Sequence, residues 1–220
     1  MTLEPLGTDL WIVRAPIPRL PFGRLMTVVR CGEDLLLHSV VALDDYAPLE
    51  ALGTPRWMIV PGGGHRLDAG TYKDRYPDLQ VYCPAGARRR VSQVVPVDGT
   101  YDDFPELEGV RVRHVDGLAG AEGVVTVDRD DGVSLVFNDL LFDVPHKPGV
   151  SGTVLKVLGS SGGPRVTLVG RASLIRDVHA VAKDLASLAS TEGLVRVVPA
   201  HEQPITDDAK AVLERIAADL

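Results

Sequence analysis

The sequence is poor in aromatic residues and in cysteine. Phe, Trp and Tyr make up 5% of its 220 residues, and its two cysteines are Cys31 and Cys83. So few cysteines exclude the disulfide framework of a small secreted domain, and two buried free thiols are expected, although a single pairing stays open. The first residues lack a basic stretch followed by an apolar one, so no secretory signal is predicted and the cytoplasm is the expected location.

Long hydrophobic runs and an excess of positive charge are also lacking. No stretch approaches 18 consecutive apolar residues, so no membrane span is predicted. The net charge is −7, and the dense basic run is confined to the arginines at 88–90. An acidic chain repels phosphate backbones, so nucleic acid is not an expected partner. The balance of 45% hydrophobic and 24% charged residues is typical of a globular protein, and we predict a single domain over residues 1–220.

Apolar patterning predicts strand-rich blocks that alternate with helices. Strands are expected at residues 9–13, 25–31, 34–41, 57–60, 79–83, 110–114, 123–127, 133–137 and 194–198. Helices are expected at residues 44–53, 68–76, 173–190 and 207–220. Asp68 is the expected N-cap of the second helix, and residues 159–164 are expected to form a surface turn. This pattern predicts two packed sheets with helices outside them.

Metal-competent polar side chains interrupt the sequence where apolar strands end. They are His38, His65, Asp139 and His201. A polar residue inside an apolar run is costly unless it has a hydrogen-bond partner or a metal ion. Because α/β folds place their sites at strand ends, these four interruptions could converge on one site.

Two of these segments resemble motifs of the metallo-β-lactamase-fold hydrolases. Residues 137–142 (Phe-Asn-Asp-Leu-Leu-Phe) resemble the segment that carries a metal-bridging Asp, and residues 198–201 (Val-Pro-Ala-His) resemble the segment of the last His ligand. Residues 6–13 and the strand that reaches Ser39 also fit the first strands of that family. The resemblance covers nearly the whole chain and implies an α+β fold, a four-layer αββα sandwich of the metallo-β-lactamase type.

The His-x-His-x-Asp-His motif of that family is degenerate in this chain. Residues 61–68 read Pro-Gly-Gly-Gly-His-Arg-Leu-Asp. Glycine replaces both histidines of the first pair, at Gly62 and Gly64, and His65 stands one position out of register. The resemblance therefore implies that the standard dinuclear zinc site is not assembled.

A metal site with fewer ligands remains an alternative. The residual ligand set is His65, Asp139 and His201, three protein ligands that would leave one position free on zinc and would also suit iron(II) or manganese. In that interpretation Asp139 and His65 are the catalytic residues. Possible further neighbours are His38, Asp68, His114 and His146. Each residue also has a structural explanation, as a strand-end, capping, core or loop residue.

Two functions follow, and the sequence leaves open whether the protein is an enzyme. The favoured one is a protein with a degenerate metal site that binds a small molecule or a partner without standard dinuclear hydrolysis. Glycines at two ligand positions would leave a pocket, with His38 and His146 among its lining. The alternative is a mononuclear metal-dependent hydrolase of an ester, thioester or related bond. The cofactor is accordingly none or one divalent metal.

Overall fold

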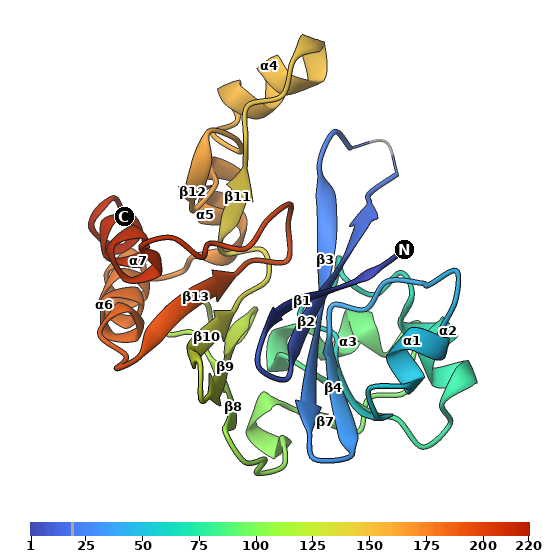
Figure 1. Cartoon of the computed structure of the whole chain (residues 1–220). Helices are drawn as coiled ribbons and strands as arrows, with labels where there is room; N and C mark the ends of the chain where they lie inside the picture. Colours follow the sequence, from blue (N-terminus) through green and yellow to red (C-terminus); the bar gives the residue numbers. More distant parts are fainter. Residues whose placement is uncertain (19) are drawn as a thin grey trace.

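Two β-sheets face each other and helices cover both outer faces in the computed structural model, which describes residues 1–18 and 20–220 (Figure 1). The predicted four-layer αββα sandwich is confirmed. Within the described residues, no helix is long and apolar enough to cross a membrane.

The first sheet has seven strands in sequential order. They are β1 (Leu3–Gly7), β2 (Leu10–Pro16), β3 (Gly23–Cys31), β4 (Asp34–His38), β5 (Thr54–Ile59), β6 (Gln80–Cys83) and β7 (Gly99–Thr100). Neighbours from β1 to β4 are antiparallel, and neighbours from β4 to β7 are parallel. The parallel half places the carboxyl ends of β4 and β5 at one edge of the sandwich.

The second sheet has the strand order β13-β10-β9-β8. These strands are β8 (Val110–His114), β9 (Gly123–Arg129), β10 (Gly132–Val136) and β13 (Leu194–Val198). Strands β10 and β13 are parallel, so their carboxyl ends also lie together. A separate two-stranded ribbon joins β11 (Phe142–Val144) to β12 (Gly163–Arg165).

Helices fall into three groups. The first sheet is covered by α1 (Ala47–Glu50), α2 (Ala69–Arg75) and α3 (Arg88–Val91), and the second by α6 (Val178–Ala189) and α7 (Ala209–Ala218). The short helix α4 (Gly149–Val157) projects beyond the sandwich next to the β11–β12 ribbon, with α5 (Leu168–Leu174) beneath it (Figure 1). Short 3-10 turns lie at Ala85–Ala87 and Tyr101–Asp103.

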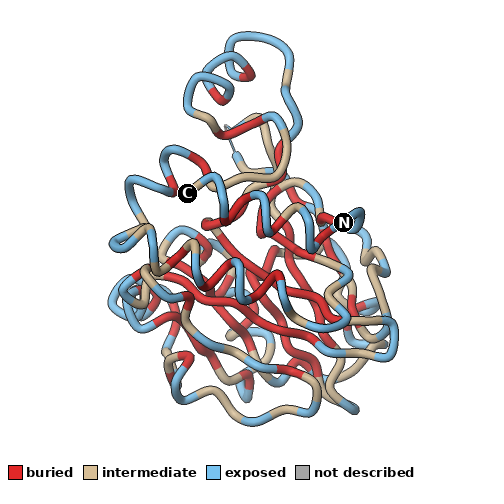
Figure 2. Tube along the Cα trace, turned by 90° about the vertical axis from the view of Figure 1, so that its left-hand side faces the viewer, coloured by how far each residue is buried: buried red, intermediate tan, exposed pale blue. Residues whose placement is uncertain are grey.

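Successive side chains of a strand point to opposite faces of its sheet, and this alternation builds three apolar layers. In β4, Leu35 and Leu37 pack under the helices, whereas Leu36 packs between the sheets. In β10, Leu135 packs under α6 and α7, and Val136 packs between the sheets. Both strands are therefore apolar on both faces, which explains their continuous hydrophobic runs. Figure 2 shows this buried interior and, beyond it, the projecting segment that contains α4, which is largely exposed.

Three sequence-based predictions were wrong in detail. The helix expected at 173–190 is two helices, because Asp177 caps α6 by accepting from the Ala180 N–H and the chain at Ile175 is extended. The strand expected at 34–41 ends at His38, because Ser39 has a φ of +58°. Asp68 does stand at the N-cap of α2, but its carboxylate accepts from Arg24 and the Ala42 N–H instead of capping.

The buried imidazole of His38 generates a prediction about acid stability. Burial, with a smaller effect of nearby His65, lowers its pKa to about 3, from 6.5 for a free side chain. Between those pH values the unfolded chain binds a proton that the folded chain excludes, so the free energy of unfolding falls as the pH drops below about 6.5. Between about pH 7 and about pH 5, the free energy of unfolding measured in urea should fall by about 2 kcal/mol more in the wild type than in His38→Gln.

The exposed His179 provides the matched control. His179→Gln should follow the wild type across the same pH range. Equal losses in wild type and His38→Gln would contradict a neutral, buried His38.

Candidate metal centre

Three side chains meet at the edge where the parallel strands of both sheets end. His65 lies in the loop after β5, Asp139 follows β10, and His201 follows β13. Their ligand-type atoms all lie within 4.8 Å of one another. Asp139 Oδ1 is 3.1 Å from Nε2 of His65 and 2.9 Å from Nε2 of His201. The fold therefore brings together the three residues that the sequence analysis selected as metal ligands.

His201 is fixed by its backbone and aromatic neighbours. Its Nδ1 lies 3.3 Å from the carbonyl oxygen of Gly23, at the start of β3. Its ring stacks on Phe142 with centroids 4.4 Å apart and packs nearly perpendicular to the Phe22 ring with centroids 5.4 Å apart. These contacts aim Nε2 at Asp139 and leave the imidazole only 6% exposed.

His65 is fixed by Ser39. The Ser39 hydroxyl lies 2.8 Å from His65 Nδ1, and both side chains are buried. Ser39 follows the last residue of β4 in the left-handed conformation, which is uncommon for a non-glycine residue. The end of β4 thus holds the ring so that its other nitrogen, Nε2, faces Asp139.

The hydrogen-bond partners of His201 fit a metal ion at its Nε2 atom. A backbone carbonyl only accepts, so Nδ1 carries the proton that faces Gly23. In a neutral imidazole Nε2 then presents a lone pair to Asp139, and an ionised carboxylate also only accepts. Either a second proton or a cation must lie between these two groups. Metal-binding histidines commonly donate their other N–H to a backbone carbonyl in this way.

The Asp139 carboxyl is held in its ionised form. Burial raises its pKa, but the adjacent His65 and His201 imidazoles outweigh burial and hold the pKa well below its usual range. Its side chain keeps 35% of its surface exposed, whereas His65 keeps 8%. The group therefore combines an accessible anion with two buried nitrogen donors.

A buried carboxylate that the sequence analysis missed positions Asp139. Glu122 accepts the backbone N–H groups of Asn138, Asp139 and Leu140 at 2.8 to 3.1 Å. Burial, and the nearby Asp139, raise the pKa of Glu122 to about 8 although these bonds lower it. Glu122 stands directly before the apolar run of β9, and an acidic residue at that place is the signal that could have found it.

Asn138 occupies the space beside Gly62. A Cβ at residue 62 would lie 2.9 Å from Asn138 Nδ2, closer than real side chains approach. The amide of Asn138 is buried, and within the described chain its Oδ1 has no hydrogen-bond partner. The expectation of empty volume in place of the first lost ligand is therefore wrong at Gly62. A Cβ at Gly64 would instead meet nothing within 4 Å.

The other predicted neighbours lie outside this group. His38 is buried in β4, and Asp68 bonds Arg24. His114 accepts from the Ala85 N–H at 3.1 Å. His146 is exposed and lies 3.0 Å from the Ser161 hydroxyl in the projecting segment. His38 and His146, expected as pocket residues, do not line the apolar cavity that opens at Asp139.

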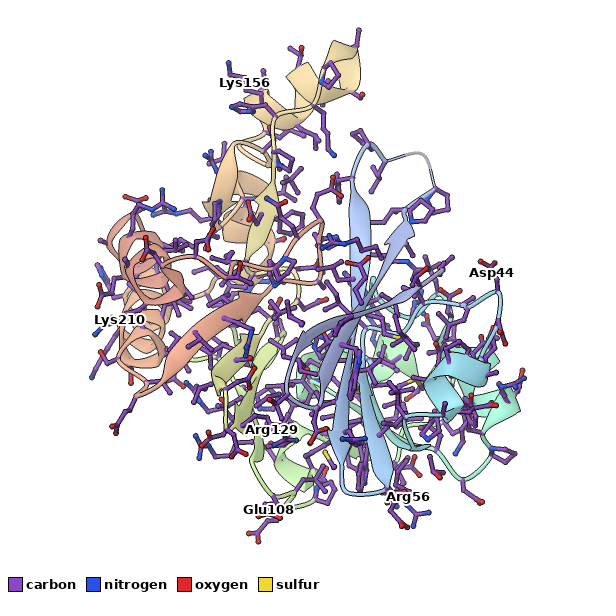
Figure 3. All side chains as sticks on the ribbon, in the orientation of Figure 1. Asp44, Arg56, Glu108, Arg129, Lys156 and Lys210 are labelled. Carbon is purple, nitrogen blue, oxygen red and sulfur yellow. The ribbon has the colours of Figure 1, made fainter. Side chains whose placement is uncertain are left out.

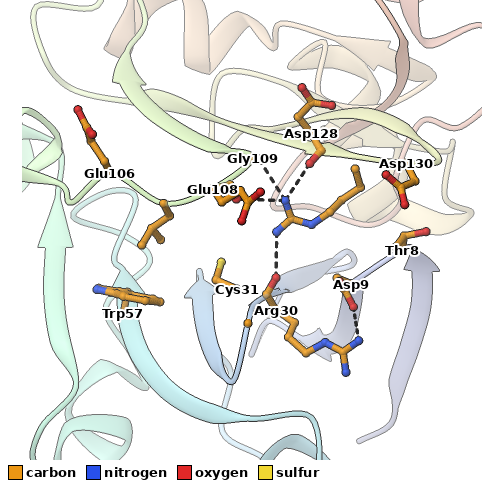
Figure 4. Close-up of a pocket in the computed structure, with 13 residues that line it drawn as sticks. Thr8, Asp9, Arg30, Cys31, Trp57, Glu106, Glu108, Gly109, Asp128 and Asp130 are labelled. Carbon is orange, nitrogen blue, oxygen red and sulfur yellow. Dashed lines mark hydrogen bonds and ion pairs between the residues drawn. The ribbon is translucent and has the colours of Figure 1, made fainter.

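A polar cavity of about 730 Å³ lies at the opposite end of the sandwich (Figure 4). Its lining includes Asp9 and Glu106 from loops at that end and Trp57 from β5. There the Arg129 guanidinium donates to backbone carbonyls that include those of Arg30 and Gly109, so it ties the two sheets together. Figure 3 shows Arg129 at this end, far from the projecting segment that carries Lys156. This cavity is therefore remote from the His/Asp group.

Replacement of Glu122 should destabilise the fold. In Glu122→Ala the N–H groups of residues 138–140 lose their buried acceptor, so the free energy of unfolding should fall by about 3 kcal/mol or more. Glu122→Gln keeps one acceptor oxygen and should fall between Glu122→Ala and the wild type. Urea unfolding measures both. Glu108→Ala, at an exposed glutamate, should change stability by less than about 0.5 kcal/mol, and an equally mild Glu122→Ala would contradict the assignment.

The contact between Gly62 and Asn138 predicts a coupled pair of mutations. Gly62→Ala should cost about 1–3 kcal/mol of unfolding free energy, because the methyl group meets a buried amide. Adding Asn138→Gly should recover part of that loss, and a double-mutant cycle measures the coupling. Gly64→Ala is the control and should be mild. Strict additivity of the two changes would contradict the contact.

Comparisons with known proteins agree with this architecture at low sequence identity. No family model matches the sequence, and no curated protein matches it significantly. Among solved structures, a metallo-β-lactamase from Hirschia baltica aligns with a TM-score of 0.62 and 13% identity, over 98% of this chain and 97% of that one. The DIM-1 metallo-β-lactamase aligns with a TM-score of 0.66 and 10% identity, over 99% of this chain and 97% of that one.

FIM-1 from Pseudomonas aeruginosa, in its mono-zinc form, aligns with a TM-score of 0.63 and 12% identity, over 99% of this chain and 95% of that one. Alignments that span both chains almost completely at such low identity establish the fold and leave the chemistry to the residues present. The chain therefore has the metallo-β-lactamase fold, in a divergent form.

Proposed function

We propose that this chain holds one divalent metal ion through His65, Asp139 and His201 and acts as a mononuclear metal-dependent hydrolase of an ester or thioester bond. The observation that carries the proposal is the convergence of three donors whose ligand-type atoms lie within 4.8 Å of one another. Two imidazoles and one carboxylate suit zinc, iron(II) or manganese, and three protein ligands leave a position free for catalysis.

The chain's own residues would orient the ligands and shape the reaction space. Ser39 and the Gly23 carbonyl hold the outer nitrogens of the two imidazoles, and Phe22 and Phe142 pack against His201. A divalent ion in this set would supply Lewis acidity toward a carbonyl oxygen and make water more acidic. Asp139, the most exposed member of the set, lies where substrate could approach.

A single ion is favoured over two. Gly62 supplies no donor, and the space beside it contains the Asn138 amide. The described residues offer one group of three or more metal-competent side chains at this spacing. The structurally similar FIM-1 enzyme, described in a mono-zinc form, supports one ion in this fold.

The second candidate is a metal-free protein that binds a small molecule or a partner. The hydrogen bonds of Asp139 favour it, because both imidazoles lie within hydrogen-bond distance of the same carboxylate oxygen, at 3.1 and 2.9 Å. In that case a doubly protonated His201 would bridge to Asp139. Metal content separates the two candidates.

Metal content should be measured by mass spectrometry on untagged protein after incubation with zinc, iron(II) and manganese. We expect about one equivalent in the wild type and at least a tenfold weaker affinity in Asp139→Asn and His201→Ala. The weakening follows from the loss of one of three ligands. Hydrolysis of p-nitrophenyl acetate should follow the metal content.

Asp143→Asn is the matched control. Asp143 is a buried carboxylate that accepts from Gln203 at 3.2 Å and stands outside the His/Asp group. It should bind metal as the wild type does. Absence of metal under all three conditions would overturn the hydrolase proposal and leave the metal-free candidate.

A further inference from the structure

An apolar cavity of about 380 Å³ opens beside the candidate metal centre. One wall is the tip of the β2–β3 hairpin, with Leu20 and Phe22, and another is the projecting segment with Leu155, Leu158 and Val169. The hairpin and the segment that contains α4 and α5 are distant in sequence and rise side by side in Figure 1. The volume of the cavity falls within the roughly 300–1,000 Å³ typical of small-molecule sites.

The cavity is continuous with the candidate metal centre through two residues. Asp139 belongs both to the His/Asp group and to the cavity lining. Phe142 lines the cavity and stacks on the ring of His201. A molecule whose reactive group lies at Asp139 would therefore place its remainder among apolar side chains.

The lining selects an uncharged ligand. Apart from Asp139, the lining residues carry no charge, so none of them could pair with an anionic group. The hydroxyls of Thr167 and Ser173 are engaged within the chain, with the Gly170 N–H and the Val169 carbonyl. The free energy available to a ligand here is mainly that of apolar burial.

The rim of the cavity is apolar and exposed. Leu20, Leu158 and Val169 keep 49%, 42% and 53% of their surface exposed. Large apolar side chains gathered at an opening mark a ligand-binding or interaction surface, whereas singly scattered ones carry no meaning. Their position around a cavity that reaches Asp139 favours a ligand that enters it.

We propose that this cavity binds the apolar acyl chain of an uncharged ester whose carbonyl group lies at Asp139. The inference rests on the proposed hydrolase function and deepens it by naming the substrate class. In the reaction, water adds to the ester carbonyl and the bond to the alkoxy oxygen breaks. The proton from water passes to the leaving oxygen, and an acid and an alcohol result.

Chain length is the first test, with metal-loaded wild-type protein and p-nitrophenyl esters of acetate, butyrate and hexanoate. Each methylene that enters the cavity should raise kcat/KM about fourfold, until the cavity is full. Binding of 1-octanol by titration calorimetry, with and without metal, probes the cavity independently of hydrolysis. We expect octanol to bind in both cases and to inhibit hexanoate hydrolysis competitively.

Two neighbouring residues give a matched pair of variants. Leu158 lines the cavity and is 42% exposed, whereas Val157 is 74% exposed and is not part of the lining. Leu158→Asp should flatten the chain-length dependence and abolish octanol binding. Val157→Asp should behave as the wild type. Ser173→Trp, which fills the cavity, should act as Leu158→Asp does, and Ser187→Trp on α6 is its control.

The outcomes separate the two proposals. Acetate hydrolysis without chain-length preference or octanol binding overturns the acyl-chain site and leaves the hydrolase function standing. Octanol binding that Leu158→Asp removes, in a protein that hydrolyses no ester, supports the apolar site and overturns the hydrolase function. Equal behaviour of Leu158→Asp and Val157→Asp also overturns the acyl-chain site.

Discussion

The hydrogen bonds of the buried Glu122 side chain are the interaction on which the candidate centre depends. Its carboxylate accepts three consecutive N–H groups of residues 138–140, just past the last residue of β10. Those groups would otherwise be buried without partners, at a cost of about 1–3 kcal/mol each. The bonds fix the chain where it leaves the sheet, so Asp139 points to the edge at which His65 and His201 arrive. One acidic residue directly before β9 thus sets the position of Asp139.

At the same edge, the chain offers fewer metal-competent side chains than the His-x-His-x-Asp-His motif contains. Gly62 and Asn138 share one space, and a Cβ at residue 62 would meet the Asn138 amide nitrogen at 2.9 Å. His65, out of register with the motif, still reaches Asp139 because Ser39 holds its outer nitrogen. The filled space at Gly62 and the cluster of His65, Asp139 and His201 therefore lie at one edge of an intact metallo-β-lactamase fold.

Much of the fold could be predicted from the sequence, because apolar runs such as those of β4, β5 and β10 are buried on both faces and leave a strong pattern. The ends of the helices and strands were harder to predict. The break between α5 and α6 depends on the Gly117 carbonyl, which accepts from Arg176 and Asp177 and lies far away in sequence. The projecting helix α4 escaped prediction because its valines Val150, Val154 and Val157 are exposed and pack against no core.

The sequence by itself determined the fold class and singled out the converging side chains His65, Asp139 and His201, because each stands just beyond an apolar strand and parallel strands end at one edge. Tertiary structure alone decided the rest. It brought Glu122 under residues 138–140, filled the space at Gly62 with Asn138, and opened the apolar cavity at Asp139. Such contacts join distant segments through buried side chains, and no local pattern of residues encodes which distant partner fills a given space.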